Sequence, residues 1–166
     1  IRPGVFAGDR TNAIPSVACY IPRGKGAFPS SVLMQSIPAK VAGVKEICII
    51  TPPGPDGSLD DATLVAARMA GVSKVFKAGG AQGIAAVAYG TQTIPKCAKV
   101  VGPGSPWVGA AKRLCSHLID VGTPAGPSEL IVLADDTADG RLAALDLIIE
   151  SEHGPDSSAF LVTWSR

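Results

Sequence analysis

The sequence predicts an α/β protein built on a mostly parallel, doubly wound sheet. Short apolar runs of strand length recur along the chain, and each precedes a glycine- or proline-rich loop and then a helix-like segment. The chain also contains an internal echo, because the pattern of helix end, glycine and buried strand at 42–50 returns at 70–77. A spacing of about 30 residues is that of a βαβ unit. Such alternation favours parallel strands connected by helices.

The amino-acid composition indicates a folded globular protein and argues against some classes of partner. The 166 residues are 46% apolar with a mean hydropathy of +0.30, which is typical of a folded globule and allows one good core, or one domain plus part of another. The net charge is +1 and only 5% of residues are aromatic, so nothing indicates nucleic acid as a partner. No run approaches the ~20 apolar residues of a membrane span.

The four cysteines are widely separated and form no C-x-x-C pair. Cys19 and Cys48 lie in strand-like apolar runs, where a thiol behaves as a small hydrophobe. We therefore predict a reducing, cytoplasmic location. The chain begins without Met and ends just past an apolar run, which suggests a piece cut from a longer protein.

The individual elements follow from these patterns. A helix that follows the glycine loop at 22–29 is expected to be capped by Ser30 or Ser31 and kinked by Pro38. That loop carries two cations, Arg23 and Lys25. In chain order, strands are predicted within 16–21, 42–50, 70–77, 98–101, 129–134 and 159–164, and helices within 31–42, 59–70, 78–90, 137–151 and a segment that ends near 116.

Three regions are predicted. Residues 1–15, rich in proline and glycine, form an irregular N-terminal segment, and 16–125 form an incomplete Rossmann-like α/β domain. Residues 126–166 are the start of a second, truncated Rossmann-like domain. The boundary lies in Thr123-Pro-Ala-Gly-Pro-Ser128, which has two prolines and a glycine.

The glycine loops are compatible with nucleotide binding, but they contain no complete nucleotide-binding motif. Neither 24–29 nor 102–107 completes G-x-G-x-x-G, and no phosphate-binding P-loop is present. Open α/β sheets nevertheless bind ligands at the carboxyl ends of their strands, and Gln82 is expected to point there from the first turn of its helix. Ordinary turn chemistry remains the alternative.

The segment 150–156 offers a candidate metal site. Glu150 and His153 are three residues apart, on one face of a predicted last helical turn that Gly154 and Pro155 end. A carboxylate and an imidazole are plausible ligands for zinc, although two ligands do not fill a tetrahedral shell. The alternative is a histidine that favours the negative end of the helix dipole. His117 is expected on the surface, without a Ser-His-Asp or Cys-His arrangement.

Eight short runs occur in one order along the chain: Phe28-Pro-Ser-Ser-Val-Leu-Met34, Ile37-Pro-Ala-Lys-Val-Ala-Gly43, Pro52-Pro-Gly-Pro-Asp-Gly57, Gly79-Gly-Ala-Gln-Gly-Ile-Ala-Ala86, Ala88-Tyr-Gly-Thr91, Val101-Gly-Pro-Gly104, Pro124-Ala-Gly-Pro-Ser-Glu129 and Glu152-His-Gly-Pro-Asp156. Taken together, they resemble the histidinol dehydrogenase family over residues from about Val17 to the end, as the middle portion of such an enzyme. The resemblance implies a two-step oxidation of the small molecule L-histidinol to L-histidine in histidine biosynthesis, with NAD and zinc as cofactors, in a homodimer.

The resemblance also implies roles for single residues. Tyr20 and Gln82 match NAD contacts, and Ser128 matches a substrate contact. His153 matches a zinc ligand, and Glu150 stands where the family usually has a glutamine ligand, so this pair would hold zinc and, through it, the substrate. The catalytic Glu-His pair and two further zinc ligands lie beyond this sequence, so the fragment alone is expected to be inactive.

Three departures from the family pattern leave alternatives open. Ser105 replaces an asparagine that contacts NAD, Glu150 adds a negative charge that weakens zinc as a Lewis acid, and Arg23 replaces a glycine near the cofactor. One alternative is a related dehydrogenase of another polar alcohol, such as a sulfopropanediol. The other is a non-catalytic chain that keeps the fold but neither metal nor cofactor.

Overall fold

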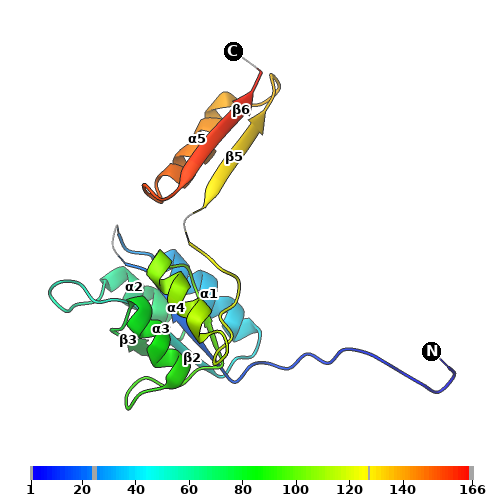
Figure 1. Cartoon of the computed structure of the whole chain (residues 1–166), viewed down its shortest axis with the longest axis vertical. Helices are drawn as coiled ribbons and strands as arrows, with labels where there is room; N and C mark the ends of the chain where they lie inside the picture. The colour runs from blue at the N-terminus through cyan, green and yellow to red at the C-terminus, as the bar shows by residue number, and fades with distance from the viewer. Residues whose placement is uncertain (1, 24–25, 127, 165–166) are drawn as a thin grey trace. The chain divides into compact units, whose positions relative to one another are not determined.

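A four-stranded parallel sheet forms the centre of the first of two structural units (Figure 1). The computed structural model describes residues 2–23, 26–126 and 128–164. It divides into Ile1–Ala125 and Gly126–Arg166. The sequence predicts a boundary between two domains at this same junction. That either part folds independently stays a prediction. Lys25, one of the two predicted loop cations, lies outside the described residues.

The strand order in the first unit is β3-β2-β1-β4, and every neighbouring pair is parallel. The chain moves outward from β1 to β3 and then returns to the other side of β1, so the topology switches between β1 and β4. This arrangement confirms the predicted α/β class with a mostly parallel sheet. The elements are β1 (Ser16–Tyr20), α1 (Pro29–Val41), β2 (Glu46–Ile50), α2 (Asp61–Met69), β3 (Lys74–Phe76), α3 (Gly80–Tyr89), β4 (Lys99–Val101) and α4 (Pro106–Cys115).

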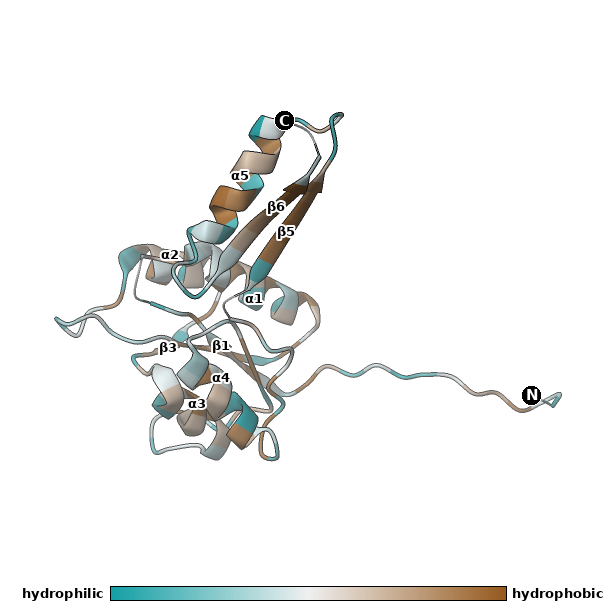
Figure 2. Ribbon diagram, turned by 45° about the horizontal axis from the view of Figure 1, so that its top comes forward, coloured by the Kyte–Doolittle hydropathy of each residue, from teal (hydrophilic) through white to brown (hydrophobic). Residues whose placement is uncertain are grey.

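Helices cover both faces of this sheet (Figure 2). Side chains alternate along a strand, so β1 sends Val17 and Cys19 to one face, and Ala18 and Tyr20 to the other. The first face packs against α1 and α2, and the second against α3 and α4. With apolar residues buried on both sides, the strands read as continuous hydrophobic runs, as fully covered parallel strands do.

The start of α1 corrects the sequence prediction. The N-cap is Phe28, which makes no side-chain capping hydrogen bond, and Pro29 is the first helical residue. Proline suits that position because its missing N–H would have no helical partner there. The predicted caps Ser30 and Ser31 therefore lie inside the helix, which then runs on through Pro38.

The second unit is a single βαβ motif. It comprises β5 (Glu129–Ala134), α5 (Gly140–Ser151) and β6 (Ser158–Thr163), with β5 and β6 parallel and paired along their full length. Apolar residues are frequent in α5 and in both strands (Figure 2), and many of them are exposed in this chain. Those of α5, between 52% and 61% exposed, are Leu142, Leu145, Ile148 and Ile149.

The cap of α5 differs from the prediction. The helix ends at Ser151, the last residue of the predicted range 137–151, but its C-cap is Glu152, and Gly154 lies beyond it with a φ of 111°. Gly154 is therefore a loop glycine rather than the helix cap, and His153 lies outside the helix.

Residues 2–15 contain neither helix nor strand, as expected of the N-terminal segment. In the described part of the chain, no helix has the length and apolar character needed to span a membrane.

Gly102 provides a test of the packing at the switch point. A Cβ added there would lie 2.2 Å from the carbonyl oxygen of Tyr20, and the φ of +110° is itself strained for other residues. We expect Gly102→Ala to destabilise the unit by about 2–4 kcal/mol. Faster hydrogen exchange in β1 and β4 peptides of the full-length protein, followed by mass spectrometry, would measure this.

Gly109→Ala is the matched control, because Gly109 lies within α4 and a Cβ there meets nothing within 4 Å. It should stabilise α4 slightly, by about 0.5–1 kcal/mol. Equal protection of β1 and β4 in both variants would contradict the close approach at Gly102.

Candidate functional site

Tyr20 ends β1 beside the switch point and connects the elements around it. Its side chain is buried, and its hydroxyl oxygen accepts a hydrogen bond from the backbone N–H of Gly80 at 3.1 Å. Its carbonyl oxygen accepts one from the side-chain nitrogen of Gln35 in α1 at 3.2 Å. One residue thus ties β1 to the N-terminus of α3 on one face and to α1 on the other.

The loop after β4 comes against the same residue. Only a glycine allows the approach of Gly102 to the carbonyl of Tyr20, as the 2.2 Å distance from an added Cβ shows. The side chain of Lys112, which is 5% exposed, donates to the carbonyl oxygen of Gly102 at 2.5 Å. Burial lowers the pKa of Lys112 because it disfavours the charged form.

Sequence reasoning missed Lys112 and Gln35. Lys112 falls at helical spacing among the buried α4 residues Val108, Ala111 and Cys115, and a lysine in such a stripe is a signal that a sequence can give. Gln35 gives no such signal. Its side-chain oxygen is buried without a hydrogen-bond partner in the described part of the chain.

The predicted cofactor residues Tyr20 and Gln82 are brought together at Gly80. The side-chain oxygen of Gln82 lies 2.8 Å from the position that a Cβ on Gly80 would occupy, and the φ of Gly80 is +61°. Gln82 itself is exposed in the first turn of α3. Tyr20 and Gln82 therefore flank one backbone N–H at the carboxyl edge of the sheet.

The third predicted cofactor residue, Ser105, lies on the same edge. It is the exposed N-cap of α4, and its side chain makes no capping hydrogen bond. The N-terminus of a helix attracts negatively charged groups because its first N–H groups have no helical acceptor. Gly80 and Ser105 thus start two neighbouring helices at the edge where parallel sheets bind ligands.

Arg23 has a local partner. Its guanidinium donates to the carbonyl oxygen of Ser58 at 2.8 Å and lies against Gly54 in the loop after β2. The hydrogen bonds of Ser58, with a smaller contribution from Arg23, hold the pKa of Asp56 below its usual range. Arg23 therefore braces the loop between β2 and α2.

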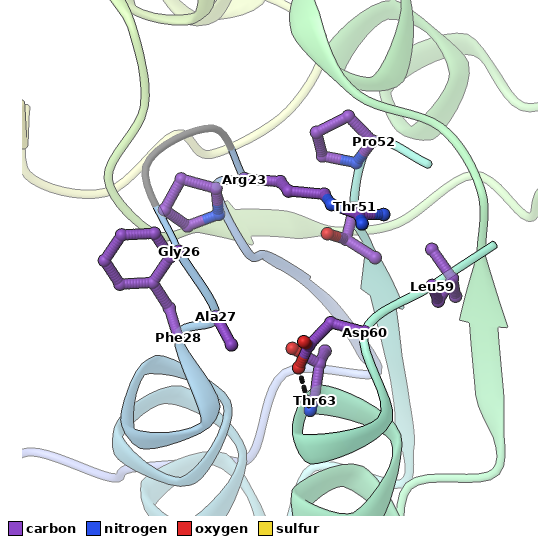
Figure 3. Close-up of a pocket in the computed structure, with 10 residues that line it drawn as sticks. Arg23, Gly26, Ala27, Phe28, Thr51, Pro52, Leu59, Asp60 and Thr63 are labelled. Atoms are coloured by element: carbon purple, nitrogen blue, oxygen red, sulfur yellow. Dashed lines mark hydrogen bonds between the residues drawn. The ribbon is translucent and has the colours of Figure 1, made fainter. Parts of the chain in front are cut away.

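A cavity of only about 10 Å³ lies beside Arg23, which is room for about one water molecule. In Figure 3, Arg23 and the loop before α1 face the start of α2, where Asp60 accepts a hydrogen bond from the N–H of Thr63. The lining residues are Pro22, Arg23, Gly26, Ala27, Phe28, Thr51, Pro52, Leu59, Asp60 and Thr63.

In the second unit, the three predicted substrate and metal residues are brought together. The hydroxyl of Ser128 donates to one carboxylate oxygen of Glu150 at 2.7 Å, and the other carboxylate oxygen lies 4.0 Å from Nδ1 of His153. Nδ1 also lies 3.3 Å from the carbonyl oxygen of Glu150. The Glu150 side chain is 14% exposed and that of His153 is 62% exposed.

The backbone pairing of β5 with β6 explains this convergence. The carbonyl of Ser128, just before β5, accepts the N–H of Ser158 at 3.2 Å, which holds the start of β5 beside the loop after α5. Residues 128 and 150 are thereby neighbours despite their separation in sequence. The predicted pairing of Glu150 with His153 persists, although His153 lies past the end of the helix.

The Ser128–Glu150–His153 cluster suits a metal ion in part. Nitrogen and oxygen ligands of one tetrahedral zinc lie roughly 3.4 Å apart, so the 4.0 Å separation needs only a small side-chain rotation. Ser128 would hold the carboxylate from behind, as outer residues of metal sites do. Among the residues that the structure describes, no group of three His, Cys, Asp or Glu side chains could hold a metal. His117 is exposed, as predicted.

The fold is that of an α/β protein with a topological switch at the carboxyl edge of its parallel sheet, and a second βαβ unit brings Ser128, Glu150 and His153 together. A family model described as histidinol dehydrogenase matches residues 1–166. The chain belongs to the histidinol dehydrogenase family, as the resemblance in its motifs predicted.

Similar proteins include the "Histidinol dehydrogenase homolog" of Colwellia psychrerythraea, 69% identical over 100% of this chain and 37% of that protein. The "Histidinol dehydrogenase" of Synechocystis sp. is 59% identical over 99% of this chain and 38% of that protein. The chain thus spans little more than a third of the length of these relatives.

Two solved structures resemble this chain in fold. The histidinol dehydrogenase from Elizabethkingia anophelis has a TM-score of 0.88 and 42% identity, covering 93% of this chain and 36% of that one. An acetylating aldehyde dehydrogenase from Geobacillus thermoglucosidasius has a TM-score of 0.52 and 20% identity over 90% of this chain and 34% of that one, which shows a likeness of fold alone.

Lys112 gives a pH-dependent prediction. Burial holds its folded pKa below the ordinary 10.5. As the pH rises through the folded pKa toward about 10.5, the unfolded state binds more protons, and the free energy of unfolding rises. Wild-type protein should therefore gain stability relative to Lys112→Met over this window, as measured by urea denaturation at several pH values.

Arg113→Met is the control, because Arg113 is the exposed neighbour of Lys112 on α4. Its stability difference from the wild type should stay constant over the same pH range. A constant difference for Lys112→Met as well would show that Lys112 is solvated rather than buried.

Proposed function

We propose that the full-length protein oxidises L-histidinol to L-histidine in two steps, with NAD as the hydride acceptor and zinc as the anchor of the substrate. Membership of the histidinol dehydrogenase family supports the reaction class. The observation that carries the assignment for this chain is the Ser128–Glu150–His153 cluster, in which three separately predicted residues meet.

Glu150 and His153 would hold the metal in this proposal. When bound, zinc supplies a positive charge that fixes the nitrogen atoms of the substrate. Ser128 donates to one oxygen of Glu150 and so leaves the other oxygen directed at His153. The 4.0 Å between that oxygen and Nδ1 of His153 is close to the spacing of two ligands of one metal ion.

NAD would bind at the switch point of the first unit. The close backbone approach at Gly102 and the hydrogen bond from Gly80 fix Tyr20 at this edge, which is where open parallel sheets bind dinucleotides. Gln82 offers an amide and Ser105 a hydroxyl on the same edge. Tyr20 accepts from Gly80 and keeps its own hydroxyl hydrogen to donate to the cofactor.

Other parts of the proposal concern residues outside this chain. The proton of the alcohol would pass to a Glu-His pair, and two more zinc ligands would complete the shell. Both groups would come from the rest of the protein, which also forms the homodimer. A cytoplasmic location is proposed with them.

A second candidate is a related dehydrogenase that acts on another polar alcohol, such as a sulfopropanediol. The relatives from Colwellia psychrerythraea, Rhizobium meliloti and Mesorhizobium japonicum, at 66–69% identity, are each called a histidinol dehydrogenase homolog. Glu150 in place of glutamine also favours a changed site. Arg23 adds little, because its guanidinium already serves the carbonyl of Ser58.

Zinc content and NAD reduction by the full-length protein test the proposal. With L-histidinol, we expect about one zinc per subunit and clear formation of NADH. Glu150→Ala should remove a ligand and lower turnover at least ~100-fold, whereas Glu150→Gln should stay within about tenfold of the wild type because its amide oxygen can still bind zinc. Asp146→Ala, one helical turn earlier and exposed, is the control.

The outcomes separate the candidates. Bound zinc without turnover of L-histidinol, but with turnover of another alcohol in a panel, would favour the second candidate. A full-length protein without zinc would contradict the metal role of Glu150 and His153.

Ser128 gives a sharper test of the cluster. Ser128→Ala removes the 2.7 Å hydrogen bond to Glu150, and loss of such an outer contact lowers metal affinity by about 10–100-fold. Zinc affinity of the full-length protein, measured by competition with a chelator, should fall accordingly. Ser151→Ala is the matched control, because the Ser151 hydroxyl donates to the carbonyl of Leu147 within α5. Equal zinc affinities in the two variants would mean that Ser128 does not hold Glu150 for the metal.

A further inference from the structure

Two cysteines that are far apart in sequence meet inside the first unit. Cys48 lies in β2 and Cys97 lies just before β4, and their sulfur atoms are 3.7 Å apart. Both residues are 3% exposed and belong to the core layer between the sheet and the helices α3 and α4. Both are free thiols.

The backbone holds the two thiols in place. The N–H of Cys97 donates to the carbonyl of Val87 in α3 at 2.9 Å, and the next N–H, of Ala98, donates to the hydroxyl of Ser16 at 2.9 Å. Cys48 is paired on both sides, with Ala18 of β1 and Lys74 of β3. Approach of the sulfur atoms is therefore a matter of side-chain rotation.

A cavity of about 200 Å³ opens next to both sulfur-bearing residues. Cys48 and Cys97 line it together with the charged residues Glu46 and Lys74, which form an ion pair with each other. A cavity of this size admits molecules as small as a hydroperoxide. The thiol pair is thus buried from bulk water but lies beside a small space.

We propose that Cys48 and Cys97 form a redox modification site, which a hydroperoxide oxidises to an intramolecular disulfide. This site lies outside the Ser128–Glu150–His153 cluster and does not rest on the proposed dehydrogenase activity. The sulfur atoms must close by only about 1.7 Å to reach the length of a disulfide bond.

Cys97 is the nucleophile of the pair. Its pKa is lowered chiefly by the hydrogen bond with the Cys48 thiol, and Ser16 and Lys74 act in the same direction, while burial and Glu46 oppose them. The pKa of Cys48 is raised by the same hydrogen bond and by burial. A thiolate therefore forms first on Cys97, and the thiolate is the form that reacts.

One molecule of hydrogen peroxide oxidises the two thiols to the disulfide. The Cys97 thiolate attacks one peroxide oxygen, so that an S–O bond forms, the O–O bond breaks, and the leaving hydroxide takes up a proton to give water. Cys48 then attacks the Cys97 sulfur, an S–S bond forms, and the S–O bond breaks. The second hydroxide leaves with the Cys48 proton as water. The two thiols lose two electrons, and the peroxide gains them.

The other two described cysteines provide internal controls. Cys19 lies in the opposite core layer, and burial raises its pKa to about 11, which makes it a poor nucleophile. Cys115 lies on α4 and is also buried.

The test uses full-length protein treated with one equivalent of hydrogen peroxide, denatured, alkylated and digested. Mass spectrometry should find a peptide pair joined through Cys48 and Cys97, with the loss of two hydrogens, while Cys19 and Cys115 stay alkylated. Cys19→Ser should give the same linked pair. Cys97→Ser and Cys48→Ser should give none.

Alkylation of Cys48 and Cys97 to the same extent as Cys19 and Cys115 after peroxide would overturn the proposal. Conversion of Cys97 to a sulfinic acid without a linked peptide would also overturn it. Because the wild-type protein carries the primary measurement, a variant that fails to fold leaves the test decisive.

Discussion

The backbone of Gly102 lies against the carbonyl of Tyr20, and the first unit is built around this contact. It occurs where β1 and β4 meet, at the point where the chain reverses its progress across the sheet. The hydroxyl oxygen of Tyr20 also accepts a hydrogen bond from the N–H of Gly80. Tyr20 therefore positions both the start of α3 and the start of the loop before α4. A side chain at Gly102 would push these elements apart, and the edge on which Gln82 and Ser105 lie would open.

Two polar groups with unusual burial reinforce the same place. Lys112 donates to the Gly102 carbonyl from a buried position, and Gln35 donates to the Tyr20 carbonyl while its own oxygen lacks a partner in the described residues. Buried polar groups cost stability unless they are hydrogen-bonded, so their presence indicates that this loop must hold its shape. A mobile loop after β4 would not need such support.

The second unit depends on a different constraint. Parallel pairing of β5 and β6 forces the segment before β5 to meet the segment after α5, and the Ser128–Glu150 hydrogen bond forms at that meeting. The exposed apolar side chains on α5 show that this unit, unlike the first, has little core of its own. Its cluster is defined by strand register rather than by burial.

The sequence by itself determined the α/β class, the order of strands and helices, and the family. It could do so because apolar runs, glycine loops and helical spacing are local signals that parallel architecture repeats. It failed at Phe28, which caps α1 in place of the predicted serines because Pro29 suits the first helical position, and at Gly154, which lies in the loop after α5 rather than at its cap. Only the tertiary structure decided which distant residues meet: Tyr20 with Gly80, Ser128 with Glu150, and Cys48 with Cys97. These contacts depend on strand order and register, which sum over the whole chain, and no local pattern encodes a distance between residues so far apart.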